Sequence, residues 1–270
     1  MSQRLGVLLC LLLALLSCAQ AQEQRRFDPL PAAKFKASSR IIGGNEIPVG
    51  KAPYMVSIQN YFGNHICGGA IIHDQYILTA ASCMGGLRKR DMKVVMSTND
   101  WAGPAWQYKV EEIIMHCKFD QPLYHNDIAL LKLETLVAYD DVTQNITLAA
   151  LNTLKEGEKL TLTGWGIEED DGDYVYNLKQ LQLAYVNNAH CNATYQGTES
   201  LDVGHLCAVG KQGTGACMGD QGGPLINEAG ELVGIVNFGV PCARGFPDVF
   251  ARVSFYYDWI LATINGCAIE

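Results

Sequence analysis

GACMGDQGGPL, residues 215–225, is the stretch on which the interpretation of this chain depends. Its glycines allow close backbone approach to a ligand, so the N–H groups of Gly219 and Gln221 can form a donor pair of the kind that binds an oxyanion. Asp220 precedes Gln221, whose carboxamide cannot be activated as a nucleophile by a neighbouring base. A motif of this length, taken alone, also fits an ordinary glycine-rich turn before a strand.

The N-terminal residues predict secretion. Residues 1–21 contain a single Arg, an apolar run from Leu5 to Leu16, and small residues before a polar segment. The run is short for a membrane span, and the pattern is typical of a cleaved signal peptide. Residues 22–40 are polar, contain two prolines and no cysteine, and are interpreted as a pro-segment. We therefore expect a secreted, extracellular chain with no membrane insertion.

Composition excludes several classes of function. The chain has 28 acidic and 20 basic side chains, a net charge of −8, which provides no basic surface for nucleic acid or for an anionic membrane. The six histidines are scattered without a metal-ligand spacing, so neither a metal nor another cofactor is expected. Eight cysteines remain after signal removal, and an even number in a secreted chain predicts disulfides.

Short apolar runs predict an all-β protein. They alternate with polar residues, are rich in β-branched side chains and are punctuated by Gly, Pro and Asn, which is typical of an antiparallel barrel or sandwich. One set lies within 54–133, and a second follows a polar connection at about 134–158. Only one helix is expected, from about 254 to 264. About 230 residues after processing suffice for one two-barrel unit or for two small domains.

Further motifs occur in a fixed order along the chain: IIGG at 41–44, TAASC at 79–83, DIALL at 127–131, TGWG at 163–166 and WI at 259–260. With GDQGGPL, this series resembles the trypsin- and chymotrypsin-like serine proteases over nearly the whole mature chain. The resemblance implies one peptidase S1-like domain at 41–270, built from two packed six-stranded Greek-key β-barrels with a ligand cleft between them. The first barrel would cover about 41–150 and the second about 151–252, followed by the C-terminal α-helix.

The catalytic triad is where the chain departs from its active relatives. Gln221 stands at the family's nucleophilic serine, and Ser82 stands at the histidine that acts as general base. A serine has no group that titrates near neutrality, so base and nucleophile are both missing. Asp127 matches the third triad position, and we expect it to be a buried carboxylate satisfied by backbone donors. The resemblance is therefore to non-catalytic serine protease homologues of the kind common in insects.

Residues 40 and 41 resemble the activation junction of the family. Cleavage after Arg40 would free the ammonium of Ile41, which the family pairs with the carboxylate before the nucleophile, here Asp220. His65 resembles the residue that can hold this carboxylate in uncut relatives. These residues predict a zymogen-like switch that orders residues 215–223 and changes affinity for a partner; the alternative is that they are inherited sequence with no remaining role.

The resemblance also places a specificity pocket. Gly215 lies at its floor, so the carboxylate of trypsin-like members is missing there. Phe238, followed by Gly239, stands where a Trp commonly lines the cleft; this indicates a retained apolar groove, although an aromatic in a barrel core would give the same pattern. Asp248 replaces a usual Gly, and it either projects a carboxylate into the pocket, blocks the pocket, or is an exposed loop residue.

Covalent features complete the expectations. The resemblance implies the disulfides Cys67–Cys83, Cys191–Cys207 and Cys217–Cys242, and elimination leaves Cys117–Cys267 as a fourth. Asn145 in NIT and Asn192 in NAT fit N-glycosylation sequons.

Together these observations predict a secreted, monomeric pseudoprotease. It would bind an extracellular protein or peptide, such as a protease, a protease substrate or an inhibitor, as a cofactor, decoy or regulator of a protease cascade. One alternative is a serine-type endopeptidase with residual activity, as analogy of fold alone would suggest. A second is a structural component of a secretion.

Overall fold

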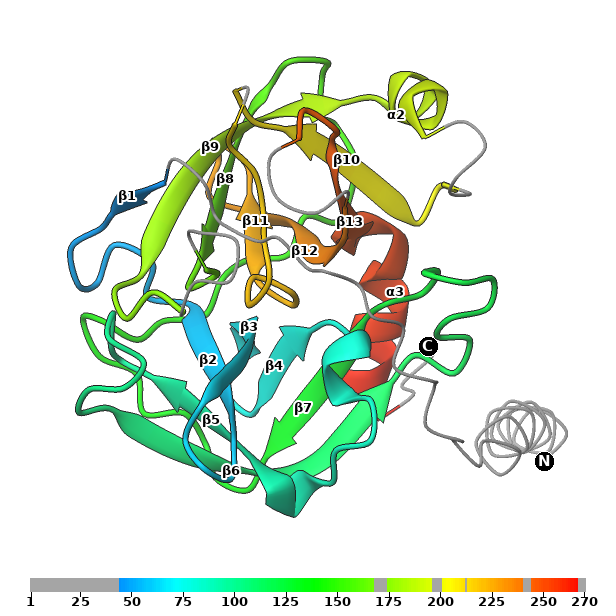
Figure 1. The fold of residues 1–270 in the computed structure, drawn as a ribbon. Coiled ribbons are helices and arrows are strands. Elements are labelled where there is room, and N and C mark those ends of the chain that lie inside the picture. Colours follow the sequence, from blue (N-terminus) through cyan, green and yellow to red (C-terminus); the bar gives the residue numbers. More distant parts are fainter. Residues whose placement is uncertain (1–43, 168–173, 196–200, 212, 240–243, 267–270) are drawn as a thin grey trace, which may run out of the picture.

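The computed structural model describes residues 44–167, 174–195, 201–211, 213–239 and 244–266 (Figure 1). The expected signal peptide and pro-segment, with Arg40 and Ile41, lie outside these residues, as do Cys242 and Cys267. No helix in the described ranges is long and apolar enough to cross a membrane.

Six antiparallel strands close the first barrel in the order β2-β3-β4-β7-β6-β5. Their bounds are β2 (Met55–Asn60), β3 (His65–His73), β4 (Tyr76–Thr79), β5 (Met92–Met96), β6 (Trp106–Met115) and β7 (Ala129–Leu133). Branched and aliphatic side chains fill the interior, including the fully buried Val56, Ile71 and Leu131. Two 3-10 turns, Ser82–Met84 and Lys89–Asp91, connect β4 to β5.

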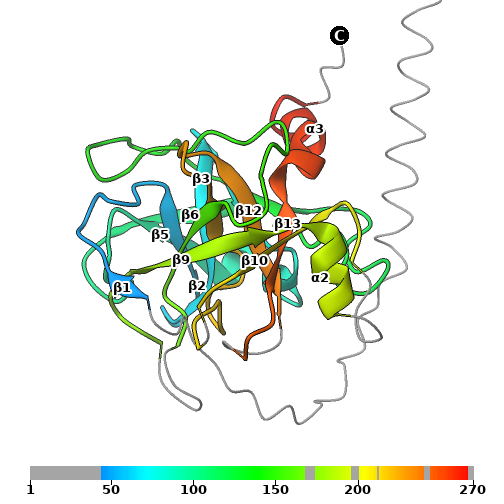
Figure 2. The ribbon, with the colours of Figure 1, turned by 90° about the horizontal axis from the view of Figure 1, so that it is seen from above.

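The second barrel closes in the order β8-β9-β10-β13-β12-β11, because β8 also pairs with β9. Its strands are β8 (Lys159–Gly164), β9 (Lys179–Val186), β10 (His205–Val209), β11 (Pro224–Ile226), β12 (Leu232–Phe238) and β13 (Asp248–Arg252). The short strand β1 (Asn45–Glu46) adds to the outside of β9 (Figure 2). The predicted pair of six-stranded barrels is therefore confirmed.

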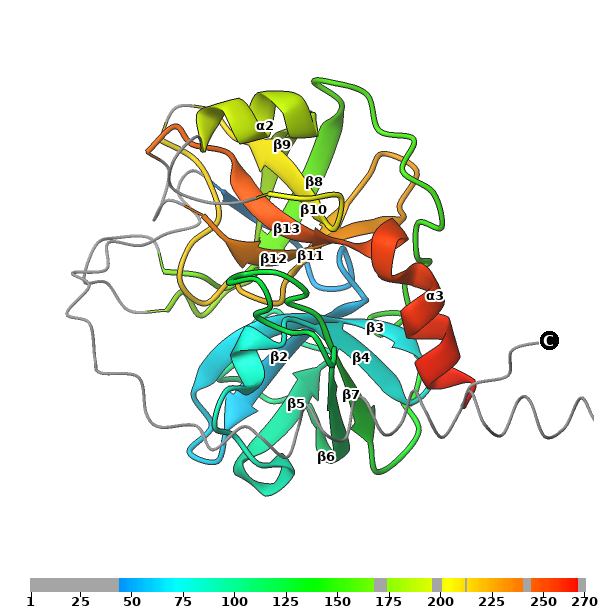
Figure 3. The same cartoon turned by 90° about the vertical axis from the view of Figure 1, so that its right-hand side faces the viewer.

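A shared apolar cluster joins the two barrels. It contains Leu130 from β7, the fully buried Trp165 after β8, and Ile235 from β12. Helix α3 (Val253–Ile264) buries Val253, Tyr256 and Ile260 in the same cluster, at positions i, i+3 and i+7 of one helical face. Figures 1 and 3 show α3 at one side of the molecule, where the barrels meet. The predicted C-terminal helix is thus confirmed.

The expectation of a single helix is wrong. A second helix, α2 (Asn188–Thr194), follows β9, and the side chain of Asn187 caps it by accepting the His190 N–H at 2.9 Å. Seven residues make two turns, which is too short for a helical repeat of apolar residues to be recognised in the sequence.

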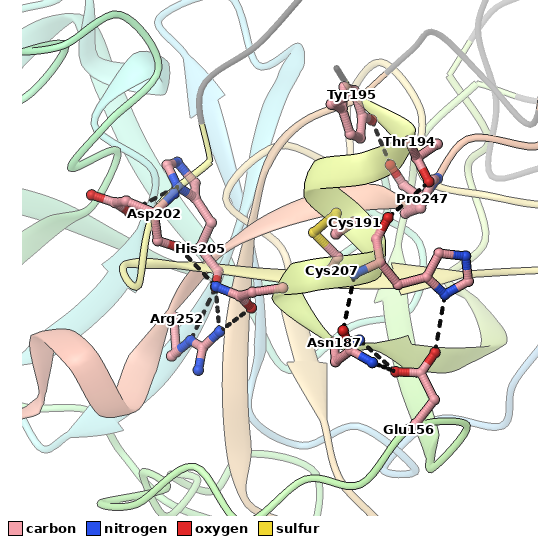
Figure 4. Close-up of a disulfide and its surroundings, with 12 residues drawn as sticks. Glu156, Asn187, Cys191, Thr194, Tyr195, Asp202, His205, Cys207, Pro247 and Arg252 are labelled. Carbon is pink, nitrogen blue, oxygen red and sulfur yellow. Dashed lines mark hydrogen bonds and ion pairs between the residues drawn. A yellow bond between two sulfur atoms is a disulfide. The ribbon is translucent and has the colours of Figure 1, made fainter.

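The Cys67–Cys83 and Cys191–Cys207 disulfides are present (Figure 4 shows the second). Cys217 is also disulfide-bonded, while its predicted partner Cys242 lies outside the described residues. Cys117 has no disulfide partner among the described residues and is half-buried, and because Cys267 lies outside those residues the Cys117–Cys267 bridge stays a prediction. That pairing rested on elimination, which carries no information on whether the two Cα atoms come within the roughly 7 Å that a disulfide needs.

Candidate functional site

The loop of residues 215–223 belongs to the second barrel and contacts the first barrel through its backbone. The N–H of Gly68, in β3, donates to the carbonyl of Gln221 at 2.8 Å. A Cβ on Gly68 would lie 2.8 Å from the Cα of Gly223, and one on Gly222 would lie 2.5 Å from the carbonyl oxygen of Gly68. Gly222 also has a φ of +76°, which L side chains rarely adopt. The barrels therefore meet here at a distance that only glycine permits.

The side chain of Gln221 closes onto the backbone donor beside it. Its Oε1 accepts the N–H of Gly219 at 3.0 Å. Gly219, with a φ of +93°, presents this N–H at the position where the family resemblance predicts an oxyanion donor. A ligand oxygen must therefore displace the Gln221 carboxamide before it can bind Gly219.

Ser82 and Asp127, the two other positions that the resemblance assigns to the triad, lie in contact. Asp127 accepts the backbone N–H of Ser82 at 2.6 Å and its hydroxyl at 2.8 Å. Only 2% of Asp127 is exposed, and burial raises its pKa to about 6, partly offset by these two hydrogen bonds. The Ser82 hydroxyl thus satisfies a buried carboxylate and supplies no base.

A different serine–histidine pair lies in the wall of the first barrel. The imidazole of His65 is within 2.8 Å of Ser57 Oγ through Nδ1 and within 2.9 Å of the Gly219 carbonyl through Nε2. A carbonyl can only accept, so Nε2 carries a proton, and burial lowers the pKa of His65 to about 4 and keeps the ring neutral. Nδ1 then accepts from the Ser57 hydroxyl. Ser57 is fully buried and His65 is 1% exposed, so no substrate reaches this pair.

Asp220 is held by backbone donors and not by His65. Its carboxylate accepts the N–H of Gly166 and the N–H of Cys217, each at 2.9 Å. The sequence-based expectation that His65 holds this carboxylate is therefore wrong in this state, since the imidazole binds the neighbouring carbonyl instead. Asp220 is completely buried without a cation among the described residues, and burial, aided by the nearby carboxylate of Asp248, raises its pKa to about 8.

We expect the stability of the uncut protein to fall with rising pH because of this carboxylate. The pKa of Asp220 is about 8 in the folded state against an ordinary 3.8, so its contribution is complete below pH 3.8 and is lost as pH rises through 8. Burial raises the pKa of Asp248 to about 7, which acts in the same direction. His65, with its pKa lowered from 6.5 to about 4, acts in the opposite direction only below pH 6.5. A decrease in the denaturant midpoint between pH 6.5 and 8 therefore measures the stability lost as Asp220 and Asp248 ionise.

Two comparisons test this pH dependence. Asp220→Asn should flatten the decline in stability between pH 6.5 and 8. The absolute stability of this variant is a poor measure, because the amide NH2 would face the N–H of Gly166 or Cys217, and two donors cannot bond to each other. Cleavage after Arg40 should flatten it as well, because the ammonium of Ile41 would pair with the carboxylate. If uncut protein, cut protein and the variant share one slope, Asp220 is not the titrating group and the expected switch is absent.

Asp248 is buried, so the interpretation as an exposed loop residue is wrong. It begins β13, is 5% exposed, and accepts the N–H of Ala216 at 2.8 Å through Oδ2. Its Oδ1 would lie 3.1 Å from a Cβ on Gly239, and the predicted floor residue Gly215 is itself buried next to Ala216. The carboxylate therefore lies among three of the segments that the resemblance assigned to the specificity pocket.

Phe238 is covered by a residue that the sequence did not indicate. Tyr124, from the segment between β6 and β7, lies with its ring centroid 4.9 Å from that of Phe238. The side-chain amide of Asn237 donates to the Tyr124 carbonyl at 3.0 Å and fixes this contact between the barrels. Tyr124 remains 38% exposed, so the pair forms an aromatic surface at the boundary of the two barrels. No motif in the sequence marks Tyr124.

Comparison with known proteins agrees with this geometry. The family model described as Trypsin matches residues 41–260. Chymotrypsin-2 of Vespa crabro is 38% identical over 220 residues, covering 82% of this chain and 98% of that protein. Trypsin 5G1 of Aedes aegypti is 31% identical over 229 residues, covering 84% and 85% respectively. Neuropsin, a serine protease expressed in the limbic system of mouse brain, superposes with a TM-score of 0.73 at 27% identity, covering 83% of this chain and all of that one.

The fold and these similarities define a two-barrel serine protease domain. The chain belongs to the trypsin family.

Proposed function

We propose that this chain is a secreted, catalytically inactive member of the trypsin family that acts by binding an extracellular protein or peptide. The observation that carries the proposal is the hydrogen bond from Gly219 N–H to Gln221 Oε1. It means that the residue at the nucleophile's position also occupies the donor that would stabilise a reaction intermediate. Ser82 supports the proposal, because its hydroxyl is bound to Asp127 and no imidazole stands at that position.

The rival function is peptide hydrolysis by other groups. The observation in its favour is the hydrogen-bonded pair Ser57 and His65, together with 38% identity to a chymotrypsin. Burial argues against it, since a nucleophile must reach the scissile carbonyl and Ser57 has no exposed surface. The Nδ1 of His65 does accept from Ser57, but the other ring nitrogen is bound to a main-chain carbonyl and not to an orienting carboxylate.

We expect the purified chain, cut after Arg40, to hydrolyse no peptide or ester substrate. Loss of a working triad costs about 10⁶-fold in kcat, which leaves a rate close to background. Labelling with an active-site-directed fluorophosphonate, followed by mass spectrometry, checks this directly because only an activated serine reacts. Turnover together with labelling of Ser57, both lost in Ser57→Ala, would overturn the proposal.

Binding is proposed to use the cleft surface that remains. Tyr124 and Phe238 form an aromatic surface at the boundary between the barrels, suited to an apolar side chain of a partner. The partner would be a protease, a protease substrate or an inhibitor, and the chain would serve as cofactor, decoy or regulator in a monomeric form. Asn145 and Asn192 are both exposed, so a glycan at either sequon would meet no packed surface.

A pull-down from the native extracellular fluid tests this role. A partner captured by the wild-type chain and lost with Tyr124→Ala, but not with the equally aromatic and more exposed Tyr61→Ala, supports binding at the cleft. Capture of nothing, or equal capture by all three chains, contradicts cleft binding and favours a structural role in a secretion.

A further inference from the structure

Three potential metal ligands converge at one edge of the boundary between the barrels. His125 Nδ1 lies 3.0 Å from one carboxylate oxygen of Asp202, and His205 Nδ1 lies 2.9 Å from the other. The ligand atoms of the three residues all lie within 4.8 Å of one another. The imidazoles meet edge to face, with centroids 4.7 Å apart. Figure 4 shows Asp202 and His205 directed toward each other.

No motif in the sequence indicates this cluster. His125 precedes the DIALL motif, whereas Asp202 and His205 stand 77 and 80 residues further along the chain. Asp202 and His205 are three residues apart, but His125 is 77 residues from Asp202, so local spacing does not reveal the set. Folding brings them together, because the start of β10 contacts the segment before β7 through His205 Nε2 and the Tyr124 carbonyl.

The spacing fits a four-coordinate ion. Ligands at about 2.0–2.2 Å from Zn²⁺ in a tetrahedral shell are themselves separated by roughly 3.4 Å, and modest movement from the observed separations reaches that value. Two imidazoles and one carboxylate are a common protein donor set for zinc. The side chain of Asp202 is 46% exposed, so water can supply the fourth ligand from that side.

Outer contacts orient the ligands. Nε2 of His205 lies 3.4 Å from the Tyr124 carbonyl, which fixes its proton there and leaves the Nδ1 lone pair for a metal. Oδ1 of Asp202 accepts the N–H of Gly204 at 2.8 Å. The guanidinium of Arg252 donates to the His205 carbonyl at 2.6 and 3.0 Å and anchors the backbone at this point (Figure 4).

Without an ion, the hydrogen bonds of the cluster conflict. Nδ1 of His205 lies 3.1 Å from the N–H of Asp202, which requires a lone pair on Nδ1. It also lies 2.9 Å from Asp202 Oδ1, which requires a proton on the same nitrogen. A neutral ring satisfies one contact or the other. A cation between the imidazole and the carboxylate would bind the lone pairs of Nδ1 and Oδ1 together, and the Asp202 N–H would give up its contact with Nδ1.

We propose that His125, Asp202 and His205 form a zinc site that ties the first barrel to the second. Both histidines are buried, at 5% and 2% exposure, so the ion would act from within the boundary of the barrels. It would also fix Tyr124, which precedes His125, over Phe238 and so rigidify the aromatic surface. The site shares no residue with the triad positions, so its test does not depend on whether the chain is an enzyme.

Zinc binding by the purified full-length chain, first treated with chelator, tests the site. We expect one Zn²⁺ per chain by equilibrium dialysis, a Co²⁺ derivative with the visible absorption of four-coordinate cobalt, and a higher Tm with either ion. Asp202→Asn keeps the shape and most hydrogen bonds of the residue; it should weaken binding by about 100-fold or more, since loss of an outer contact alone costs 10–100-fold. His190→Asn is the matched control, because it removes an exposed histidine 3.2 Å from a single carboxylate, Glu156.

Loss of zinc binding can be distinguished from failure of a variant to fold. His125→Gln provides a second ligand variant, and circular dichroism with a thermal melt establishes that each chain is folded before metal is added. Zinc bound with the same affinity by wild type and by a folded ligand variant would overturn the proposal, as would loss of binding in His190→Asn alone. Absence of zinc binding by the wild-type chain would overturn it as well.

Discussion

A chain carrying both Ser82→His and Gln221→Ser, cut after Arg40, is expected to hydrolyse peptide substrates at least about 10³-fold faster than the wild type, out of the roughly 10⁶-fold that a triad contributes. Two features of the structure support this. Asp127 already faces the side chain at position 82, 2.8 Å from the Ser82 hydroxyl, so it can orient an imidazole placed there. Removing the Gln221 carboxamide also frees the Gly219 N–H to bind the reaction intermediate.

The single reversions are the matched controls for this experiment. Ser82→His supplies a base with no nucleophile, and Gln221→Ser supplies a hydroxyl with no base, so each should remain close to the wild-type rate because triad members act as a unit. Adding Asp127→Asn to the double variant should remove most of the gain. Initial rates with chromogenic peptides measure all of these. A folded double variant no faster than the wild type would show that the cleft has diverged beyond the triad positions.

The second large effect is expected from Gly222→Ala. The added Cβ would lie 2.2 Å from Thr79 Oγ1 and 2.5 Å from the carbonyl oxygen of Gly68, in a residue whose φ of +76° disfavours any side chain. Backbone strain of about 1–2 kcal/mol and overpacking of about 1–3 kcal/mol together predict a loss of about 2–5 kcal/mol in the free energy of unfolding. For a domain of this size, that corresponds to a fall in Tm of roughly 4–20 °C.

Gly157→Ala separates the two contributions to that loss. Gly157 has nearly the same φ, +78°, but a Cβ there would meet no atom within 4 Å. It should therefore cost only the backbone strain, about 1–2 kcal/mol. Urea unfolding of the two variants and the wild type measures the difference. Equal losses in the two variants would mean that the contact between the barrels at Gly222 is unimportant for stability.

The fold could be predicted from the sequence because the patterns that indicate it occur many times along the chain. Apolar alternation along many strands and a series of motifs in fixed order gave two barrels and a terminal helix, with α3 ending at Ile264. The helix α2 was missed because two turns are too short to show a helical periodicity. The position of the Asp248 side chain was left undecided because residue type alone does not say whether a carboxylate is buried. Local rules indicate secondary structure but not which distant side chains meet.

The site was accessible only in part, for the same reason. The proposed loss of base and nucleophile at Ser82 and Gln221 rests on residue identity and on the family resemblance. The bond from Gly219 N–H to the Gln221 side chain depends on a rotamer, and the contact of Tyr124 with Phe238 depends on how the barrels pack. Neither rotamers nor packing between distant segments leave a pattern in the sequence.

The contact of Gly68 with Gly222 and Gly223 has a consequence for how such a chain evolves. The position of the loop is fixed by main-chain atoms and by the absence of side chains, and the side chain at position 221 takes no part in that contact. Mutations at 221 can therefore accumulate under weak selection for folding, whereas mutations at the neighbouring glycines are eliminated. A gene duplicate can lose its chemistry by one substitution at position 221 while the loop keeps its place, whereas a return to an enzyme needs changes at both position 82 and position 221.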